Sequence, residues 1–195
     1  MRKHNILTVV ALTLLAALGA CSRKADTKPL DAAGVRYSVI TKLEEMNVSA
    51  NEVANVARAK DTGLSDEACL ELVRLSRSRG GEFNEGDAVG VLAGVQFTED
   101  EVMTLARQNQ LGLWVGEVQA MRLAGVSKPV ILALARERSK ARPSISSPNI
   151  VRLQDSGLSD NQIIELIESG TTDSAAGALA RERMPKGPSK FQRLR

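Results

Sequence analysis

Histidine, cysteine and aromatic residues are all scarce in this chain of 195 residues. It has one histidine, two cysteines and 3% aromatic residues. The histidine is His4, in a segment that we expect to be removed, and we expect a lipid to consume one cysteine. A chain with no histidine and one thiol cannot form a Ser-His-Asp triad, a Cys-His dyad or a His-ligated metal site. We therefore expect no such enzyme, no cofactor and no metal.

The apolar run at the N-terminus is shorter than a membrane-spanning helix. It covers residues 6–18, contains nothing more polar than Thr8 and Thr13, and follows the basic Arg2 and Lys3. As a helix it would be about 20 Å long, whereas the hydrocarbon core of a bilayer is about 30 Å thick. Residues 1–20 are therefore interpreted as a secretory signal peptide.

The quartet Leu18-Gly19-Ala20-Cys21 resembles the lipobox of bacterial lipoproteins. The resemblance implies a diacylglycerol thioether on Cys21, cleavage before this residue and acylation of the new amine. Because Ser22 stands where Asp would mark inner-membrane retention, it also implies an outer-membrane anchor facing the periplasm. In a source without an outer membrane, the anchor would be on the outer face of the plasma membrane. The alternative is an ordinary signal peptide followed by a chance cysteine.

The rest of the chain divides into three parts by composition. We expect a polar tether over residues 21–29, a helical domain over residues 30–184 and a basic tail over residues 185–195. Without Arg2 and Lys3 there are 24 basic and 23 acidic side chains, so the chain after the signal peptide is nearly neutral. The tail has two prolines and one glycine, and we expect it to be disordered in isolation.

Five segments repeat one helix-start pattern. Each has an apolar residue, then Ser or Thr, then apolar residues four and seven positions after the hydroxyl residue. The hydroxyl would accept a hydrogen bond from a backbone N–H of the first turn, and the apolar residue before it would pack on the one four positions after it. The hydroxyl residues are Ser49, Ser65, Thr98, Ser127 and Ser159.

Weaker helix starts fill the gaps. They lie at Leu30-Asp31, Phe83-Asn84, Ile145-Ser146 and Thr171, with a further helix expected around residues 112–121. The last four strong caps are spaced by 33, 29 and 32 residues, which is typical of arrays of two-helix repeats. We predict an all-α fold of eight to ten short helices paired as αα-hairpins, arranged either as an open array or as a compact bundle.

Two individual side chains are candidates for a function. Cys69 takes a position where the other repeats have Val or Ile, so we expect it to be a buried core residue. Trp114 lies between Gly112 and Gly116, which would let a backbone or ligand approach closely. It is a candidate for lining a binding groove, and filling the core beneath a turn is the alternative.

Charged residues are interpreted in two ways. Acids such as Asp66, Glu67 and Glu99 look like first-turn, cap or solvent-face charges. Basic residues gather in two clusters, which are candidates for contact with an anionic envelope surface. The alternative is solvated charge at a helix end. The clusters are Arg136, Arg138, Lys140 and Arg142, and then Lys186, Lys190, Arg193 and Arg195.

These observations favour a lipid-anchored envelope protein with a non-catalytic interaction or scaffold role. Its expected partners are the membrane, through the anchor, and a protein of the envelope. Nucleic acid is not expected, because no recognition motif is present. Two alternatives are an envelope hydrolase acting on cell-wall material through two facing carboxylates, and a helical bundle that binds a small ligand.

Overall fold

The computed structural model describes residues 24–111, 115–140 and 144–184, and within those ranges the chain is all helical. This confirms the all-α prediction. Among the described residues, no helix combines the length and the apolar character needed to cross a membrane. The helices are α2 (Lys28–Ala32), α3 (Tyr37–Glu45), α4 (Ala50–Asp61), α5 (Asp66–Ser78), α6 (Gly86–Gly94), α7 (Glu99–Arg107), α8 (Val115–Leu123), α9 (Lys128–Ser139), α10 (Ser147–Asp155), α11 (Asp160–Glu168) and α12 (Asp173–Arg183).

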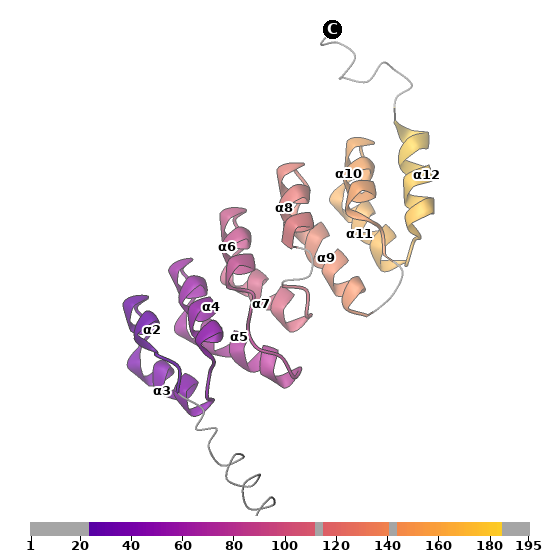
Figure 1. Cartoon of the computed structure of the whole chain (residues 1–195). Coiled ribbons are helices and arrows are strands. Elements are labelled where there is room, and N and C mark those ends of the chain that lie inside the picture. The colour runs from indigo at the N-terminus through magenta and orange to yellow at the C-terminus, as the bar shows by residue number, and fades with distance from the viewer. Residues whose placement is uncertain (1–23, 112–114, 141–143, 185–195) are drawn as a thin grey trace, which may run out of the picture.

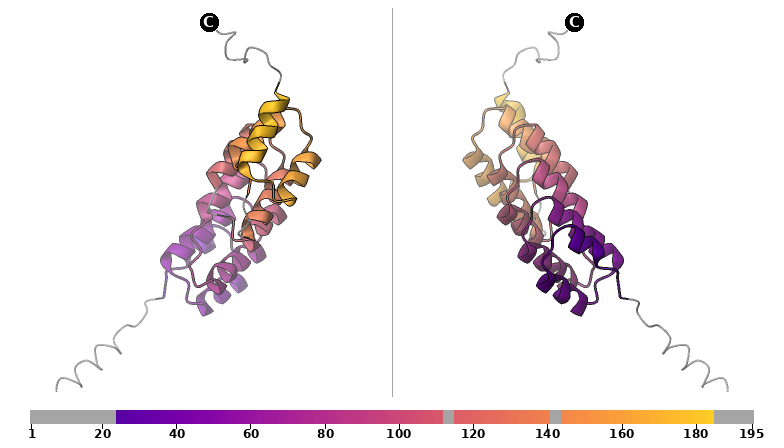
Figure 2. Two further views of the ribbon diagram at one scale, coloured as in Figure 1. Left: turned by 90° about the vertical axis from the view of Figure 1, so that its right-hand side faces the viewer. Right: turned by 90° about the vertical axis from the view of Figure 1, so that its left-hand side faces the viewer.

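The helices alternate between two layers (Figure 1). The even layer contains α2, α4, α6, α8, α10 and α12, and the odd layer contains α3, α5, α7, α9 and α11. Within each layer every helix packs against the helix two places along the chain. The molecule is therefore an elongated array, with α2 and α3 at one end and α12 at the other (Figure 2). Of the two arrangements left open by the sequence, the packing is that of the array.

Five turns that lead from an even-layer helix to the next odd-layer helix are built alike. Each has four residues, of which the second has a positive φ and the third is a buried apolar residue. Glycine adopts this left-handed conformation readily and commonly ends a helix with it. The positive-φ residues are Gly34, Gly63, Gln96, Gly125 and Gly157, and the buried residues after them are Val35, Leu64, Phe97, Val126 and Leu158.

The five strong helix starts of the sequence are N-caps. Three of them form complete capping boxes, in which the cap side chain and the side chain three residues later each accept a backbone hydrogen bond. In a fourth, the Ser65 hydroxyl accepts from the Ala68 N–H at 3.1 Å. The capping boxes are Ser49 with Glu52, Thr98 with Glu101, and Ser159 with Gln162.

The expected hydroxyl hydrogen bond is missing at two helix starts. Ser127 and Ser146 have the extended backbone of an N-cap, but neither side chain accepts a hydrogen bond from the first turn. Each helix has a proline in its first two positions, Pro129 in α9 and Pro148 in α10. Proline has no N–H to offer a capping oxygen, and its fixed φ already suits the first turn.

The predicted number of helices and three of the weaker starts are wrong. There are eleven helices in the described ranges because Gly34, with φ of 77°, separates α2 from α3. Leu30 and Asp31 lie inside α2 and do not open it. The caps of α6 and α12 are Glu85 and Thr172, each one residue after the predicted position. At α12 two adjacent threonines made the pattern ambiguous, and before α6 the Asn84 side chain accepts a hydrogen bond from Asn51 of α4 instead of capping its own helix.

One register position forms an apolar seam along the odd layer. Leu72, Leu105 and Leu134 each lie seven residues after the cap of their helix, and none is more than 1% exposed. Positions four, seven and eight of a helix share one face, so this leucine contacts the core together with its neighbours. Because each odd-layer helix packs on the next, the seam is covered on both sides as far as α9.

Candidate functional site

Polar contacts between repeats join residues about one repeat apart. Arg36 contacts Asp66 across 30 positions, Ser49 contacts Glu82 across 33, and Ser65 contacts Glu99 across 34. The repeat that the cap spacing indicated is therefore also the spacing at which charged side chains of stacked helices meet. One of these contacts, Arg36 with Asp66, reaches a buried carboxylate, and Glu52 is another buried carboxylate with a cation from a different helix.

The first buried carboxylate is Asp66, at the start of α5. It is 4% exposed, and it accepts hydrogen bonds from the backbone N–H of Arg36 at 3.0 Å and from Nε of Arg36 at 2.7 Å. The Lys60 ammonium lies 2.7 Å from its other oxygen. Burial by itself would raise the pKa of Asp66, but Lys60 and Arg36 outweigh it and lower the pKa to about 2. The carboxylate is thus charged, with a cation beside each of its oxygens.

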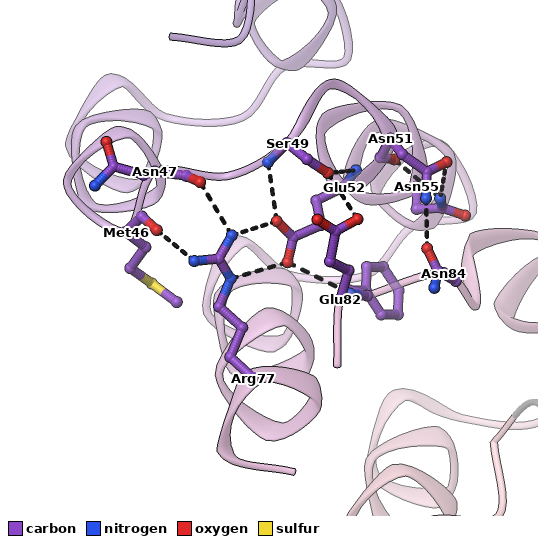
Figure 3. A network of polar contacts seen from close by, with 10 residues as sticks. Met46, Asn47, Ser49, Asn51, Glu52, Asn55, Arg77, Glu82 and Asn84 are labelled. Atoms are coloured by element: carbon purple, nitrogen blue, oxygen red, sulfur yellow. Dashed lines mark hydrogen bonds and ion pairs between the residues drawn. The ribbon is translucent and has the colours of Figure 1, made fainter. Parts of the chain in front are cut away.

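The second buried carboxylate is Glu52 of α4, which is 0% exposed (Figure 3). Arg77 of α5 forms a two-pronged ion pair with it, with Nε at 3.0 Å. Glu52 also accepts the N–H of Ser49 at 2.9 Å and of Phe83 at 3.4 Å. Burial raises the pKa of Glu52, but the ion pair with Arg77 and these N–H donors reverse the direction, so its pKa is lowered.

Two arginines at the end of α5 hold the helices on either side of it. The Arg77 guanidinium also donates to the backbone carbonyls of Met46 and Asn47, just after α3 (Figure 3). The Arg79 guanidinium donates to the carbonyls of Ala106 and Arg107 at the end of α7, at 2.8 and 2.9 Å. Carbonyls at a helix C-terminus have no partner within the helix and attract cations. The arginines therefore fasten α3, α5 and α7 together.

Another recurring contact links the starts of helices in adjacent repeats. The first-turn acid of one helix accepts the N–H of the N-cap residue of a helix in the preceding repeat. The distance is 3.0 Å for Asp66 with Arg36 and 2.6 Å for Glu99 with Ser65. It is 2.7 Å for Asp173 with Ser146. The interpretation of such acids as first-turn charges was right, but it missed that they join one repeat to the next.

The described members of the first basic cluster are each paired with acids. Arg136 contacts Glu168 of α11, Arg138 lies 3.1 Å from Glu117 of α8, and Lys140 lies 2.6 Å from Glu137. Glu117 and Glu168 belong to neighbouring repeats, so sequence proximity did not reveal them. The pairs of Arg136 and Arg138 therefore join helices within the array, whereas that of Lys140 lies at the end of α9. Arg142 and the whole second cluster, Lys186, Lys190, Arg193 and Arg195, lie outside the described residues.

Cys69 occupies the core position expected from the repeat. It is 0% exposed and carries no disulfide. Burial raises the pKa of the Cys69 thiol to about 12, with a smaller opposing effect of Lys60. Because the thiolate is the reactive form, this side chain is chemically inert in the folded protein.

Three pockets bear on the ligand and hydrolase alternatives. The first, between α5 and α7, includes Arg79 and Phe83; the second, between α8 and α10, includes Met121 and Val151; the third lies between α11 and α12. None of the three brings two carboxylates together, because each has a single glutamate in its lining. No group of three His, Cys, Asp or Glu in the described ranges is placed to hold a metal ion.

Trp114, the candidate groove residue, and Cys21, the candidate lipid site, lie outside the described residues.

No protein-family model, curated protein or solved structure matches the chain. The function therefore has to be inferred from the chemistry of its own residues. The charged groups with shifted pKa values are ion-paired or hydrogen-bonded within the protein, and the one described thiol is buried. The arrangement is suited to holding repeats in a fixed stack. The burial of Asp66 and Glu52 was not predicted, because the arginines that pair with them lie 30 and 25 positions away.

Proposed function

We propose that the chain is a lipid-anchored scaffold protein of the bacterial envelope that holds a protein partner close to the membrane and has no catalytic activity of its own. The observation that supports this most directly is the elongated two-layer array (Figure 2). Stacked helix repeats expose long continuous surfaces, which such proteins use to bind other macromolecules. The ion pairs between repeats favour a stack with a fixed surface.

The anchor at Cys21 is supported by the lipobox-like quartet and by the short distance to the first helix. α2 begins at Lys28, seven residues after Cys21. Seven extended residues span at most about 25 Å, so an acylated Cys21 would keep the first end of the array near the bilayer. Each buried methylene of the lipid contributes about 0.8 kcal/mol, and two or three chains would make the attachment stable.

The anchor can be tested with the two cysteines of the chain. The wild-type protein should sediment with membranes and carry an acyl mass on Cys21, and Cys21→Ala should lose both. Cys69→Ala is the matched control, because its thiol is buried and it should remain with the membranes. Purified protein that retains Met1 and lacks an acyl group would exclude the anchor and the compartment together.

The scaffold role can be tested by cross-linking in cells at native expression level, followed by purification and mass spectrometry. We expect an envelope protein to be recovered with the wild-type chain and to be reduced with Cys21→Ala, because the anchor brings the two together. Recovery of this chain alone would contradict the scaffold. Release of wall fragments by the purified protein would favour the hydrolase instead.

The pocket between α8, α9 and α10 favours a second candidate function, binding of a small apolar ligand. It has a volume of about 390 Å³ and an apolar lining that includes Ala120, Met121 and Val151. Ligand pockets are typically about 300–1,000 Å³ and mostly apolar. The only tryptophan in the chain, Trp114, immediately precedes α8, so a change in its fluorescence during a ligand screen would support this function. Filling the pocket with Ala120→Phe, which should block that change and adds no second tryptophan, provides the control.

A further inference from the structure

The last odd-layer helix of the described residues, α11, has one uncovered side. Leu166 lies seven residues after the Ser159 cap, in the same register as Leu72, Leu105 and Leu134. Those three leucines are fully buried, whereas Leu166 is only half-buried. The difference arises because α5, α7 and α9 are each followed in the odd layer by another helix. No described helix follows α11 in that layer (Figure 1).

A groove lies at this uncovered side, between α11 and α12. It has a volume of about 280 Å³, and its apolar residues are Leu158, Leu166 and Leu179. Its exposed charged residues are Glu165 of α11 and Arg183 of α12. The leucine seam that is buried elsewhere in the odd layer is thus exposed at Leu166. The groove there has an apolar base and the Glu165 carboxylate at its edge.

The helix that forms one wall of the groove, α11, is negatively charged, whereas the groove lining itself has one acid, Glu165, and one base, Arg183. α11 contains Asp160, Glu165 and Glu168 and has no basic residue. Glu168 is taken by Arg136, but Asp160 and Glu165 form no ion pair with any other described residue. A segment that covers the groove should therefore carry apolar side chains together with positive charge.

The segment that follows α12 has this composition. Residues 185–195 contain four basic residues, no acid, and the apolar Phe191 and Leu194. They start beside the groove, because Arg183 at the end of α12 lines it. Phe191 is eight residues beyond Arg183, and an extended chain of that length reaches about 26 Å. α11 has nine residues and is about 13 Å long, so the segment can span it.

We propose that residues 185–195 cover this groove in the same chain. Phe191 and Leu194 pack on Leu166 and Leu179, and Lys186 or Lys190 lies beside Glu165. The segment takes the place of the missing odd-layer neighbour and closes the end of the array. This goes beyond the scaffold proposal, because the basic tail then binds to its own chain and not to a surface of the envelope. The exposed faces of the two layers remain available for a partner.

Zero-length carbodiimide cross-linking of the full-length processed protein in detergent tests the contact directly. This reagent joins an amine to a carboxylate only when the two touch. We expect an amide between Lys186 or Lys190 and Glu165 or Asp160, identified by mass spectrometry. The double variant Asp160→Asn, Glu165→Gln should lose it. Asp155→Asn, which removes an exposed acid of α10 outside the groove, should keep it.

An equal mixture of unlabelled and ¹⁵N-labelled protein shows which chain contributes the segment. Cross-linked peptides of a single isotope composition support the proposal. Peptides of mixed composition would overturn it in favour of a second copy, and absence of the cross-link would overturn it altogether.

Amide hydrogen exchange provides a second measurement that does not depend on charge contacts. Peptides of α11 should exchange several-fold faster in Phe191→Asp, Leu194→Asp than in the wild type. The matched control Ser189→Asp, Gln192→Asp adds the same charge but retains both apolar side chains, so it should change exchange less. Equal exchange in all three proteins would overturn the proposal. Protection of α11 that appears only after anionic vesicles are added would do so as well.

Discussion

The two ends of the array leave different surfaces uncovered. At the first end, the positions of α3 that are not buried carry Tyr37, Thr41, Glu44 and Glu45 among others, and Thr27 donates a hydrogen bond to Glu44 at 2.8 Å. At the other end, α11 leaves Leu166 half-buried beside an apolar groove. At the first end, α3 already presents polar side chains to solvent. At the second end, the apolar groove beside α11 remains exposed unless another segment packs on it.

This difference follows from how helical arrays are stabilised. Each repeat buries its apolar face only against its neighbours, so the end repeats require a polar outer face to remain soluble. The first end also has two buried carboxylates, Asp66 and Glu52, which join α3, α4 and α5 through cations. Toward the second end, the buried Glu137 has the cations Arg136 and Lys140 beside it. The pairs Arg136–Glu168 and Arg138–Glu117, which join helices there, are more exposed. The two ends should therefore respond differently to the same kinds of substitution.

The largest difference should appear when the seam leucine is truncated at two places. Leu134→Ala removes a side chain that is 0% exposed, and it should lower the free energy of unfolding by about 3.5 kcal/mol. Leu166→Ala should cost less than this, because no helix packs on that side of Leu166 and only the docked residues 185–195 cover it. Urea unfolding followed by circular dichroism measures both losses. A loss of only about 1 kcal/mol for Leu166→Ala would mean that the groove is open in solution, which would contradict the docked segment.

Breaking the pair at the buried Glu52 should be nearly as costly. Arg77→Ala leaves an uncompensated carboxylate inside the protein and should lower the free energy of unfolding by about 3 kcal/mol. Arg74→Ala, on the same helix but exposed, is the control and should change it by less than about 0.5 kcal/mol. Similar losses for both variants would show that the Glu52 pair does not hold the first end together.

The Asp66 cluster should make stability depend on pH in the acid range. Its pKa is about 2 in the folded protein against an ordinary value of 3.8. A lowered pKa stabilises the fold above the ordinary value, and this contribution is lost as the pH falls toward 2. Between about pH 5 and pH 2.5 the wild type should lose about 1.5 kcal/mol that Asp66→Asn does not lose. Urea midpoints of both proteins at the two pH values test this, and parallel pH curves would contradict it.

The smallest effect is expected from the exposed ion pair near the second end. Arg136 and Glu168 are each about half exposed, and the buried Glu137, 3.9 Å from Arg136, keeps Lys140 at 2.6 Å, so Arg136→Ala should cost less than about 0.5 kcal/mol. The loss should shrink further in high salt, because solvent ions screen exposed charges. A thermal melt at low and high salt provides the measurement. A loss as large as that of Arg77→Ala would remove the distinction between the two ends.

The helix starts and turns were largely predictable because their signals are local. A cap such as Ser65 and the residues that pack near it lie within two turns of one helix, and Gly63 ends the preceding helix by its own backbone preference. Errors occurred where two nearby residues could serve equally well, as with Thr171 and the true cap Thr172. The role of Cys69 as a core residue followed from its place in the repeat.

The polar sites could not be predicted in the same way. Glu52 reads as an ordinary capping-box residue, and its second role depends on Arg77, 25 positions later. Likewise, Arg136 and Arg138 look like a solvent-facing cluster until Glu168 and Glu117 are brought beside them from other repeats. Spacing alone does not reveal such partners, because each helix can rotate its charged face in several directions before its neighbours are in place.

The all-helical structure, the starts of most helices and a repeat of about 30 residues could be inferred from the order of the amino acids alone. These features depend on hydrogen bonds and packing within one or two helical turns. The two layers, the burial of Asp66 and Glu52, and the half-buried position of Leu166 followed only from the packing of the helices. Burial depends on which helix packs against which, and that is set by contacts between residues a full repeat apart.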